Sequence, residues 1–425
     1  MREMKDSGIE WVGIIPSHWI IHPVYYYFSE RKNKNRFGQE DNLLSLSYGK
    51  IIRKDINTSE GLLPESFNTY NIVEKGDIVI RPTDLQNDKR SLRTGLVPER
   101  GIITSAYICL KPIKDIDSRF FNYQLHSYDV IKVFYNMGNG VRQGLNFSEF
   151  SHLLVFEPPL DEQKRIAGYL DAKCAEIDAL TADIQTQIDT LEQYKRSVIT
   201  EAVTKGLNPD AEMKDSGYDW VGMMPSTWIM RKGKYMFVQR SLRGNSIELQ
   251  LLSPTQKFGV IPQSLYEELT GMSAVKLNEK TDLSLLKTIH KGDFCISLRS
   301  FQGGFEYSEY EGVVSPAYQV FYPTVDIADG YYRYLFKETG FIDKMNSYTM
   351  TLRDGKNIAF ADFGNTYIPY PPVGEQYRIA AFLDIKVAEI DAIIGQKKDQ
   401  LSTLDAYKKS LIYEYVTGKK EVPAQ

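Results

Sequence analysis

Basic side chains alternate with amide side chains in several short stretches of this sequence. Arginine and lysine hold phosphates or guanine, and asparagine and glutamine pair with adenine, so these stretches could contact a nucleic acid. Each stretch taken alone is also compatible with an ordinary solvated loop. The candidates in the first half are Arg31, Lys32, Lys34, Arg36, Arg81, Gln86, Asn87, Lys89, Arg90, Arg93, Arg142 and Gln143. Those in the second half are Arg240, Arg243, Asn245, Arg299, Gln302, Arg353 and Lys356.

Catalytic motifs are missing from the sequence. It contains no G-x-x-x-x-G-K-[ST] phosphate loop, no G-x-G-x-x-G fingerprint after a strand and no NPPF-like tetrapeptide of an amino-methyltransferase. Residues 209–214 superficially match the PD…ExK pattern of nucleases, but the same Glu-Met-Lys recurs at residues 3–5 without Pro-Asp. The five histidines are scattered. We therefore expect no catalytic residues and no enzyme activity in this chain.

Metal and membrane sites are not indicated either. The three cysteines, Cys109, Cys174 and Cys295, lie far apart without Cys or His neighbours at ligand spacing, which predicts buried thiols and no bound metal. No stretch approaches the roughly 18 apolar residues of a membrane span, and the first ten residues are polar. We expect a cytoplasmic protein that does not contact a membrane.

The charge is unevenly distributed along the 425 residues. The net charge of −4 argues against a non-specific nucleic-acid binder. Residues 159–212 carry a net −5, whereas residues 20–158 and 229–370 carry +2 and +1. The acidity therefore belongs to a connecting segment, and any nucleic-acid contact must come from local loops.

Internal repetition is the strongest feature of the sequence. Residues 3–19 recur as residues 212–228, with 12 of 17 positions identical at an offset of 209. All four tryptophans of the protein lie in these two copies, and we interpret them as hydrophobic anchors. A second repeat, at an offset of 213, pairs residues 158–206 with the segment that starts at Pro371.

The second repeat has the pattern of a long helix. Apolar residues follow one another at a mean spacing of 3.6, which predicts two helical rods of roughly 60 Å. The first stripe contains Ile166, Leu170, Cys174, Ile177, Leu180, Ile184, Ile188, Leu191, Tyr194, Val198 and Ala202. The second keeps this spacing except where Lys397 interrupts it, and contains Ile379, Leu383, Val387, Ile390, Ile393, Leu401, Leu404, Tyr407, Leu411 and Tyr415.

A single apolar stripe on so long a helix must be buried. We expect the two rods to pair with each other, antiparallel, so that one chain mimics a two-fold symmetric dimer. The predicted pairing residues are Ile166, Leu170, Ile177, Ile184, Ile188, Leu191, Ile379, Leu383, Ile390, Leu401, Leu404 and Leu411. The alternative is two independent helices, each packed on its own domain.

Two globular domains remain between the repeats. The strand patterns after Lys75-Gly76 and Lys291-Gly292 match each other, while most loop residues differ. This predicts a mixed α/β (α+β) fold in which a duplicated scaffold carries different loops. The predicted organisation is a repeat segment at 1–19, a domain at 20–158, a helix at 159–206, a linker and second repeat segment at 207–228, a domain at 229–370, a helix at 371–418 and a tail at 419–425.

These motifs resemble the specificity subunit of type I restriction-modification systems. The resemblance rests on the KDSGxxWVGxxPSxW openings, the PPxxEQxRIAxxLDxKxAEIDA helix starts and the KGDxxI strands, and it spans residues 3–418. It implies two target-recognition domains that each read one half of a split site in double-stranded DNA. It also implies two partner methyltransferase subunits, which bind S-adenosylmethionine and methylate adenine N6, with or without restriction subunits. This chain itself would hold no cofactor.

The paired rods would fix the distance between half-sites, which must be about a helical turn, roughly 34–36 Å, or a multiple of it. Inserting four residues near Thr186 should then change the spacer and leave the half-sites unchanged. Two other functions remain open on the residues alone. One is a protein scaffold without DNA, and the other is a self-sufficient nuclease or methyltransferase.

Overall fold

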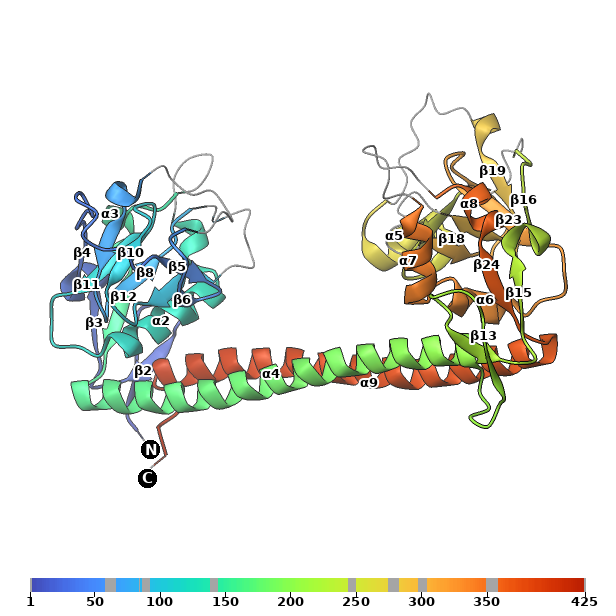
Figure 1. Ribbon diagram of the computed structural model, residues 1–425. Helices are drawn as coiled ribbons and strands as arrows, with labels where there is room; N and C mark the ends of the chain where they lie inside the picture. Colours follow the sequence, from blue (N-terminus) through green and yellow to red (C-terminus); the bar gives the residue numbers. More distant parts are fainter. Residues whose placement is uncertain are drawn as a thin grey trace. The chain divides into compact units, whose positions relative to one another are not determined.

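The structure is a computed structural model that describes residues 2–57, 66–83, 85, 92–137, 144–243, 250–273, 283–296, 304–348 and 358–423. It divides into two compact units, and each is treated separately. Unit 1 comprises residues 1–185 and 398–425, and unit 2 comprises residues 186–397. Each unit contains part of two long helices, α4 (Leu160–Lys205) and α9 (Val373–Val416). Within each unit, the sheets lie on one side of these helices (Figure 1). Among the described residues, no helix is long and apolar enough to cross a membrane.

Unit 1 begins with the first copy of the repeat segment and continues into small antiparallel sheets. Its strands are β1 (Met4–Asp6), β2 (Ile14–Pro16), β3 (Ile20–Pro23), β4 (Phe28–Glu30), β5 (Leu44–Ser47), β6 (Lys50–Arg53), β7 (Asn71–Val73), β8 (Ile78–Ile80), β9 (Thr94–Leu96), β10 (Gly101–Ile103), β11 (Ile108–Pro112) and β12 (Leu154–Glu157). Its short helices are α1 (Val24–Tyr27), η1 (Phe67–Thr69), α2 (Ser118–Val130), η2 (Val133–Asn136) and α3 (Phe147–Phe150).

Unit 2 repeats this order after α4. Its strands are β13 (Met213–Asp215), β14 (Met223–Pro225), β15 (Ile229–Lys232), β16 (Phe237–Gln239), β17 (Leu252–Thr255), β18 (Gly259–Pro262), β19 (Lys287–Ile289), β20 (Phe294–Ile296), β21 (Phe305–Tyr307), β22 (Gly312–Val314), β23 (Gln319–Pro323) and β24 (Tyr367–Tyr370). Its short helices are η3 (Gly233–Tyr235), α5 (Gln263–Thr270), η4 (Leu283–Leu285), α6 (Asp329–Leu335), α7 (Thr339–Ser347) and α8 (Phe360–Asn365).

Each sheet of unit 1 has a counterpart in unit 2. The central sheet has the order β4-β11-β8-β9 in unit 1 and β16-β23-β20-β21 in unit 2. The pairs β7–β10 and β19–β22, β5–β6 and β17–β18, and β3–β12 and β15–β24 also correspond. The mixed α+β fold and the duplicated scaffold predicted from the sequence are therefore confirmed.

The long helices contact each other along a seam with a period of seven residues. The seam consists of the residues reached by alternate steps of four and three, from Gln163 to Ala202 on α4 and from Gln376 to Tyr415 on α9. Each of these residues is buried or half-buried. This is the 3.5-residue repeat of a coiled coil. Of the predicted pairing residues, Ile166 and Ile379 lie off this seam, although both are buried in the cores of their units. The seam members are Leu170, Ile177, Ile184, Ile188, Leu191, Leu383, Ile390, Leu401, Leu404 and Leu411.

The predicted 3.6-residue stripe was wrong at four other positions. Leu180, Tyr194, Ile393 and Tyr407 are between 43% and 53% exposed. In each case the next residue along the helix lies on the seam instead, as Ile394 does at 3% exposure. The reason is geometric, because paired helices keep contact at 3.5 residues per turn and a straight 3.6 stripe drifts away from the partner.

Polar residues on the seam link the two helices. In unit 1, Lys408 forms an ion pair with Asp178, and the rings of Tyr169 and Tyr415 lie 4.6 Å apart. In unit 2, Lys195 lies 2.7 Å from Asp391, and Lys397 donates to Gln187. Partner numbers fall as residue numbers rise, so the helices run antiparallel. The alternative of two independent helices is wrong.

The repeat segments join the ends of the helices within each unit. In unit 1, the indole of Trp19 donates to Glu162 of α4 at 3.2 Å, and its ring lies against Gly418 at the end of α9. In unit 2, the indole of Trp228 donates to Glu375 of α9, and its ring lies against Gly206 at the end of α4. Both tryptophans are fully buried, which agrees with their interpretation as anchors.

Candidate nucleic-acid interface

The three basic clusters predicted in each half of the sequence map to three equivalent loops. The first follows β4 in unit 1 and β16 in unit 2. The second joins β8 to β9, and β20 to β21. The third precedes α3 and α8. Candidates chosen by side-chain type therefore fall at matching positions on the duplicated scaffold.

The first two loops leave the same end of the central sheet. In unit 1, β4 and β8 both pair antiparallel with β11, which lies between them, so β4 and β8 run in the same direction. In unit 2, β16 and β20 flank β23 in the same way. The loops that follow these strands therefore run toward the same edge of the sheet, although the first loop begins level with the start of β8, since Glu30 and Ile78 both pair with Leu110.

The third loop joins the same end. In unit 1, the amide of Leu145 donates to the carbonyl of Pro82, just after β8, at 3.0 Å. In unit 2, Gln319 is paired with Ile296 at the end of β20, and its side-chain amide donates to the carbonyl of Ile358 at 2.9 Å. The described residues that flank the second and third loops thus lie together beyond the end of β8 and of β20, the edge toward which the first loop runs.

This end, called the loop end below, lies opposite to the long helices. Strand β11 runs against β4 and β8, and the chain that leaves its carboxyl end reaches α4, where the amide of Asp117 donates to Gln163 at 2.9 Å. The equivalent contact in unit 2 is the amide of Ala328 donating to Gln376, also at 2.9 Å. Each unit therefore has a helix side and a loop end.

Two of the predicted contact arginines have partners inside their own units. Arg31 donates to Asp77 at 3.0 Å, and Arg240 donates to both oxygens of Asp293 at 2.7 and 2.9 Å. Each aspartate belongs to a Lys-Gly-Asp turn and also accepts from a backbone amide of that turn. Burial raises the pKa of Asp77, and the Arg31 hydrogen bond opposes that rise. These arginines fix the start of the first loop, a role that the sequence alone did not reveal.

Arg93 is also internal. It is 0% exposed, and its guanidinium donates to the carbonyl of Thr83 at 2.6 Å. Its own amide donates to Asp129, which is also buried. Arg93 therefore holds the β8–β9 loop from within.

The remaining described candidates lie at or near the surface. Lys32 pairs with Glu30 at 2.8 Å, and Lys34 donates to the carbonyl of Thr69 at 3.0 Å. Arg36 and Arg243 are exposed, and Arg81 is half-buried. The other candidates lie outside the described residues and stay predictions, namely Gln86, Asn87, Lys89, Arg90, Arg142, Gln143, Asn245, Arg299, Gln302, Arg353 and Lys356.

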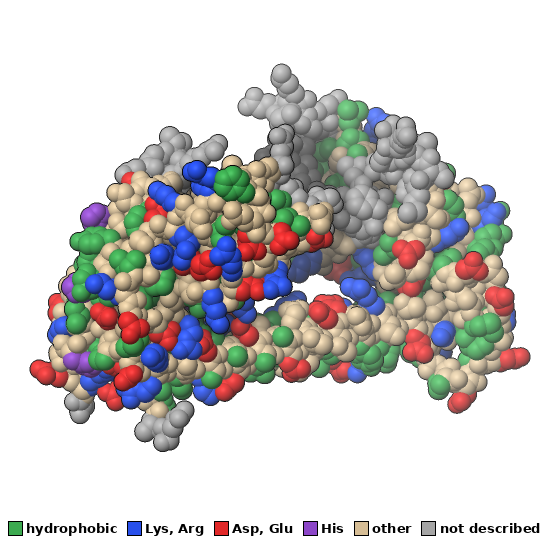
Figure 2. Space-filling model, turned by 60° about the vertical axis from the view of Figure 1, so that its left-hand side comes forward, with side chains coloured by type: hydrophobic (Ala, Val, Ile, Leu, Met, Phe, Trp, Pro, Cys, Tyr) green, Lys and Arg blue, Asp and Glu red, His purple; other side chains and the backbone are tan. Residues whose placement is uncertain are grey.

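Charges of both signs are intermingled on the surface that Figure 2 displays, where blue and red side chains alternate over the unit nearest the viewer. This agrees with the near-zero net charge of each globular part. Among the described residues, no group of His, Cys, Asp and Glu could hold a metal ion. All three cysteines are free and buried, and burial raises the pKa of Cys109 to about 12.

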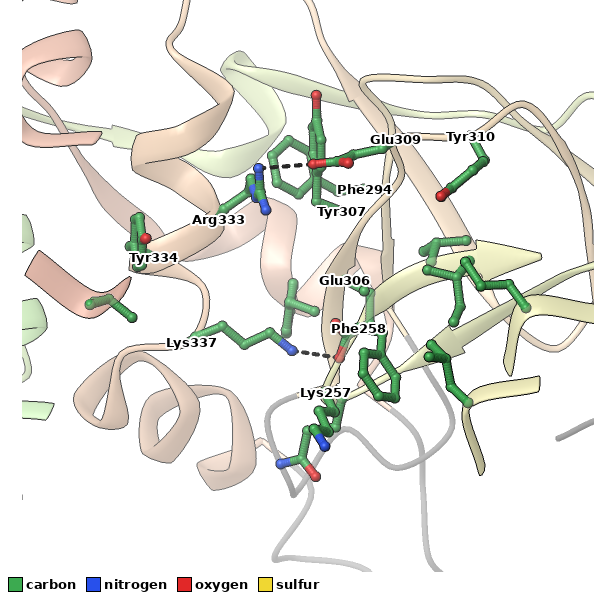
Figure 3. Close-up of a pocket in the computed structure, with 18 of the residues that line it drawn as sticks. Lys257, Phe258, Phe294, Glu306, Tyr307, Glu309, Tyr310, Arg333, Tyr334 and Lys337 are labelled. Carbon is green, nitrogen blue, oxygen red and sulfur yellow. Dashed lines mark hydrogen bonds and ion pairs between the residues drawn. The ribbon is translucent and has the colours of Figure 1, made fainter. Parts of the chain in front are cut away.

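Unit 2 contains a cleft of about 620 Å³ between the β17–β18 hairpin, β21 and α6 (Figure 3). Glu306 lies on its floor with Lys337 at 2.5 Å, and burial raises the pKa of Glu306 to about 7. In unit 1 the equivalent position is Gly95, where an added Cβ would lie 2.6 Å from Leu46 of the β5–β6 hairpin. The hairpin packs directly on the sheet there and stands off it in unit 2.

Comparison with known proteins gives a consistent result. Residues 230–403 match the family model described as the type I restriction modification DNA specificity domain. Over these residues the chain is similar to type I restriction-modification specificity subunits. A Methanocaldococcus jannaschii relative, provisionally named the type I restriction enzyme MjaX specificity subunit, is 22% identical over 97% of this chain and 96% of its own length.

Two further matches extend the comparison. The MjaVIII specificity subunit of the same organism is 24% identical, over 76% of this chain and 75% of its own length. A solved structure described as "Structural basis underlying complex assembly and conformational transition of the type I R-M system" has a TM-score of 0.67. It is 14% identical and covers 96% of this chain and 99% of its own, so it shows that the fold is shared.

Proposed function

We propose that this chain is the non-catalytic DNA-reading subunit of a type I restriction-modification complex, and that it recognises a split site in double-stranded DNA. The observation that carries the proposal is that the strands and flanking residues of each unit direct three loops toward its loop end. The scaffold below them is repeated, while the loop sequences differ. A repeated frame with unlike loops suits two different half-sites.

The partners follow from the same duplication. Two methyltransferase subunits dock on the repeated helix sides, and these partners, rather than this chain, bind S-adenosylmethionine and methylate adenine N6. Restriction subunits join where the system encodes them. The complex works in the cytoplasm, where it reaches chromosomal DNA, and has no membrane partner.

The test is selection from random duplexes. The purified chain, with its methyltransferase, is incubated with pools in which two random blocks flank a spacer of variable length. We expect enrichment of one split motif with a fixed spacer. Sequencing of methylated adenines in the host chromosome should return the same motif.

Two outcomes would contradict the proposal. Stable assembly with the methyltransferase but no enriched motif would favour a protein scaffold. Nuclease or methyltransferase activity of the purified chain, with magnesium or S-adenosylmethionine, would favour a self-sufficient enzyme. Salt concentration must be held constant throughout, because phosphate contacts make affinity steeply dependent on salt.

A further inference from the structure

The aromatic side chain of Phe37 projects from the first loop of unit 1. It is 82% exposed, although large apolar side chains are usually covered. The loop follows β4 and therefore belongs to the loop end. A single exposed apolar residue needs no explanation by itself, so what matters is how this one is held.

The turn that carries Phe37 is braced from beneath. Asn35 is 1% exposed, and its side-chain amide donates to the carbonyl of Glu40 at 2.9 Å while its oxygen accepts from the Glu40 amide at 3.1 Å. The amide of Gly38 donates to the carbonyl of Asn35 at 3.0 Å, and Gly38 has a φ of +61°, which favours glycine. The loop is thus fixed before any partner binds, so little ordering entropy would be lost on contact.

The surroundings of Phe37 favour DNA as the partner. Residues 31–39 contain four cations and no acid, and the neighbouring Arg36 is exposed. The amide of Asn35 donates to the carbonyl of Tyr70, which places the turn beside the end of η1. A cation next to a projecting ring combines a phosphate contact with a surface that can stack on bases.

We propose that Phe37 is an apolar wedge that stacks against a base step in the half-site read by unit 1. This inference rests on the proposed function and assigns one residue within it. The ring partly unstacks that step, and Arg36 holds a phosphate beside it. The corresponding loop of unit 2, residues 240–251, contains no aromatic residue, so the aromatic wedge belongs to unit 1 alone.

Tyr48 provides a matched control. It is 83% exposed and lies in the β5–β6 turn of the same unit. Two residues away, Lys50 forms an ion pair with Asp178 of α4 at 2.9 Å, so this turn lies on the helix side rather than at the loop end. Both substitutions remove an exposed ring, and only Phe37→Ala should affect DNA.

The experiment uses the full chain with its methyltransferase and the enriched duplex. Phe37→Ala should weaken binding roughly 5- to 150-fold, the range that loss of one stacked base gives. Phe37→Trp should retain the affinity, and Tyr48→Ala should match the wild type. The salt dependence should not change for Phe37→Ala, whereas Arg36→Ala should reduce its slope by about one.

A local probe locates the step. With 2-aminopurine placed at successive positions of the half-site, wild-type binding should raise fluorescence at one step, and Phe37→Ala should abolish that rise. Unchanged affinity with Phe37→Ala, or weaker methyltransferase binding with unchanged DNA binding, would overturn the inference. If the wild type itself enriches no split motif, the proposed function fails first.

Discussion

The indole nitrogen of Trp228 donates a hydrogen bond to Glu375 at 3.0 Å, and this contact joins the second repeat segment to the first turn of α9. Trp228→Phe should lower the free energy of unfolding by about 1.5–3 kcal/mol, the usual contribution of a hydrogen bond to a charged group. Trp220→Phe is the control, because the buried indole nitrogen of Trp220 has no hydrogen-bond partner among the described residues. Urea unfolding measures both variants, and an equal loss would show that the bond is unimportant.

The end of α9 is packed too closely for any side chain. Gly418 has a φ of +67°, and an added Cβ would lie 2.5 Å from Pro16. Gly8 has the same φ with nothing within 4 Å, so Gly8→Ala should cost only about 1–2 kcal/mol of backbone strain. Gly418→Ala should cost about 1–3 kcal/mol more because of the clash. Thermal unfolding that shows equal losses would contradict this packing.

The heptad seam changes how the helix-length test should be designed. Seven residues inserted after Gln185 and seven after Lys397 keep the seam in register and lengthen the rods by about 10 Å. The preferred spacer should grow by about three base pairs at 3.4 Å each. An insertion of four residues near Thr186, in α4 only, breaks the register of the seam. It should therefore give a less sharply defined spacer length than the paired seven-residue insertions. A change in the half-site sequences, measured by selection, would mean that the helices do not set the spacing.

The loops that follow β8 and β20 should act independently. Lys89→Gln with Arg90→Gln should weaken or relax only the half-site of unit 1, because each loop belongs to one unit. Arg299→Gln should do so only in the other half-site, and so serves as the matched comparison. Selected motifs from the variants report both effects. Relaxation of both half-sites by either variant would argue against separate readers.

Glu306 should make the stability of unit 2 depend on pH. Its folded-state pKa of about 7 lies above its ordinary value of 4.5, so the folded unit holds a proton that the unfolded chain has released between these values. Stability should therefore fall as pH rises from about 4.5 to 7, by up to about 3 kcal/mol.

The Glu306→Gln variant should lose this decline, because its side chain does not ionise. Glu309→Gln should retain it, since the carboxylate of Glu309 is 60% exposed. Urea unfolding across this pH range compares the three proteins. An unchanged slope in Glu306→Gln would assign the pH dependence to another group.

The repeats and the long helices could be predicted from the sequence, because each leaves a periodic or repeated pattern, whereas the equivalence of the basic loops became visible only from the order of the strands. The seam could not be placed exactly on the helix faces, since one helix alone does not reveal the supercoil that its partner imposes. Leu180 and Ile393 are apolar and well spaced, yet both are exposed. Only the pairing of α4 with α9 decides which side is covered.

The candidate contacts were less predictable for a related reason. Side-chain type alone cannot separate an arginine that faces solvent from one with an internal partner, such as Arg31 with Asp77 or the buried Arg93. One signal was present in the sequence. Arg31 and Arg240 each stand 12 residues after the last tryptophan of a repeat segment, Trp19 or Trp228, as a structural pair would. Phe37 gave no such signal, because exposure is not encoded in residue type.

The joint between each globular part and its long helix uses a main-chain donor. Gln163 accepts from the backbone amide of Asp117, and Gln376 accepts from that of Ala328. Asp117 and Ala328 have unlike side chains, yet both make this contact, because the hydrogen bond comes from the backbone amide. Changes of side chain in a globular domain therefore leave this attachment intact. One globular domain can be replaced by another during evolution without any change in the long helix.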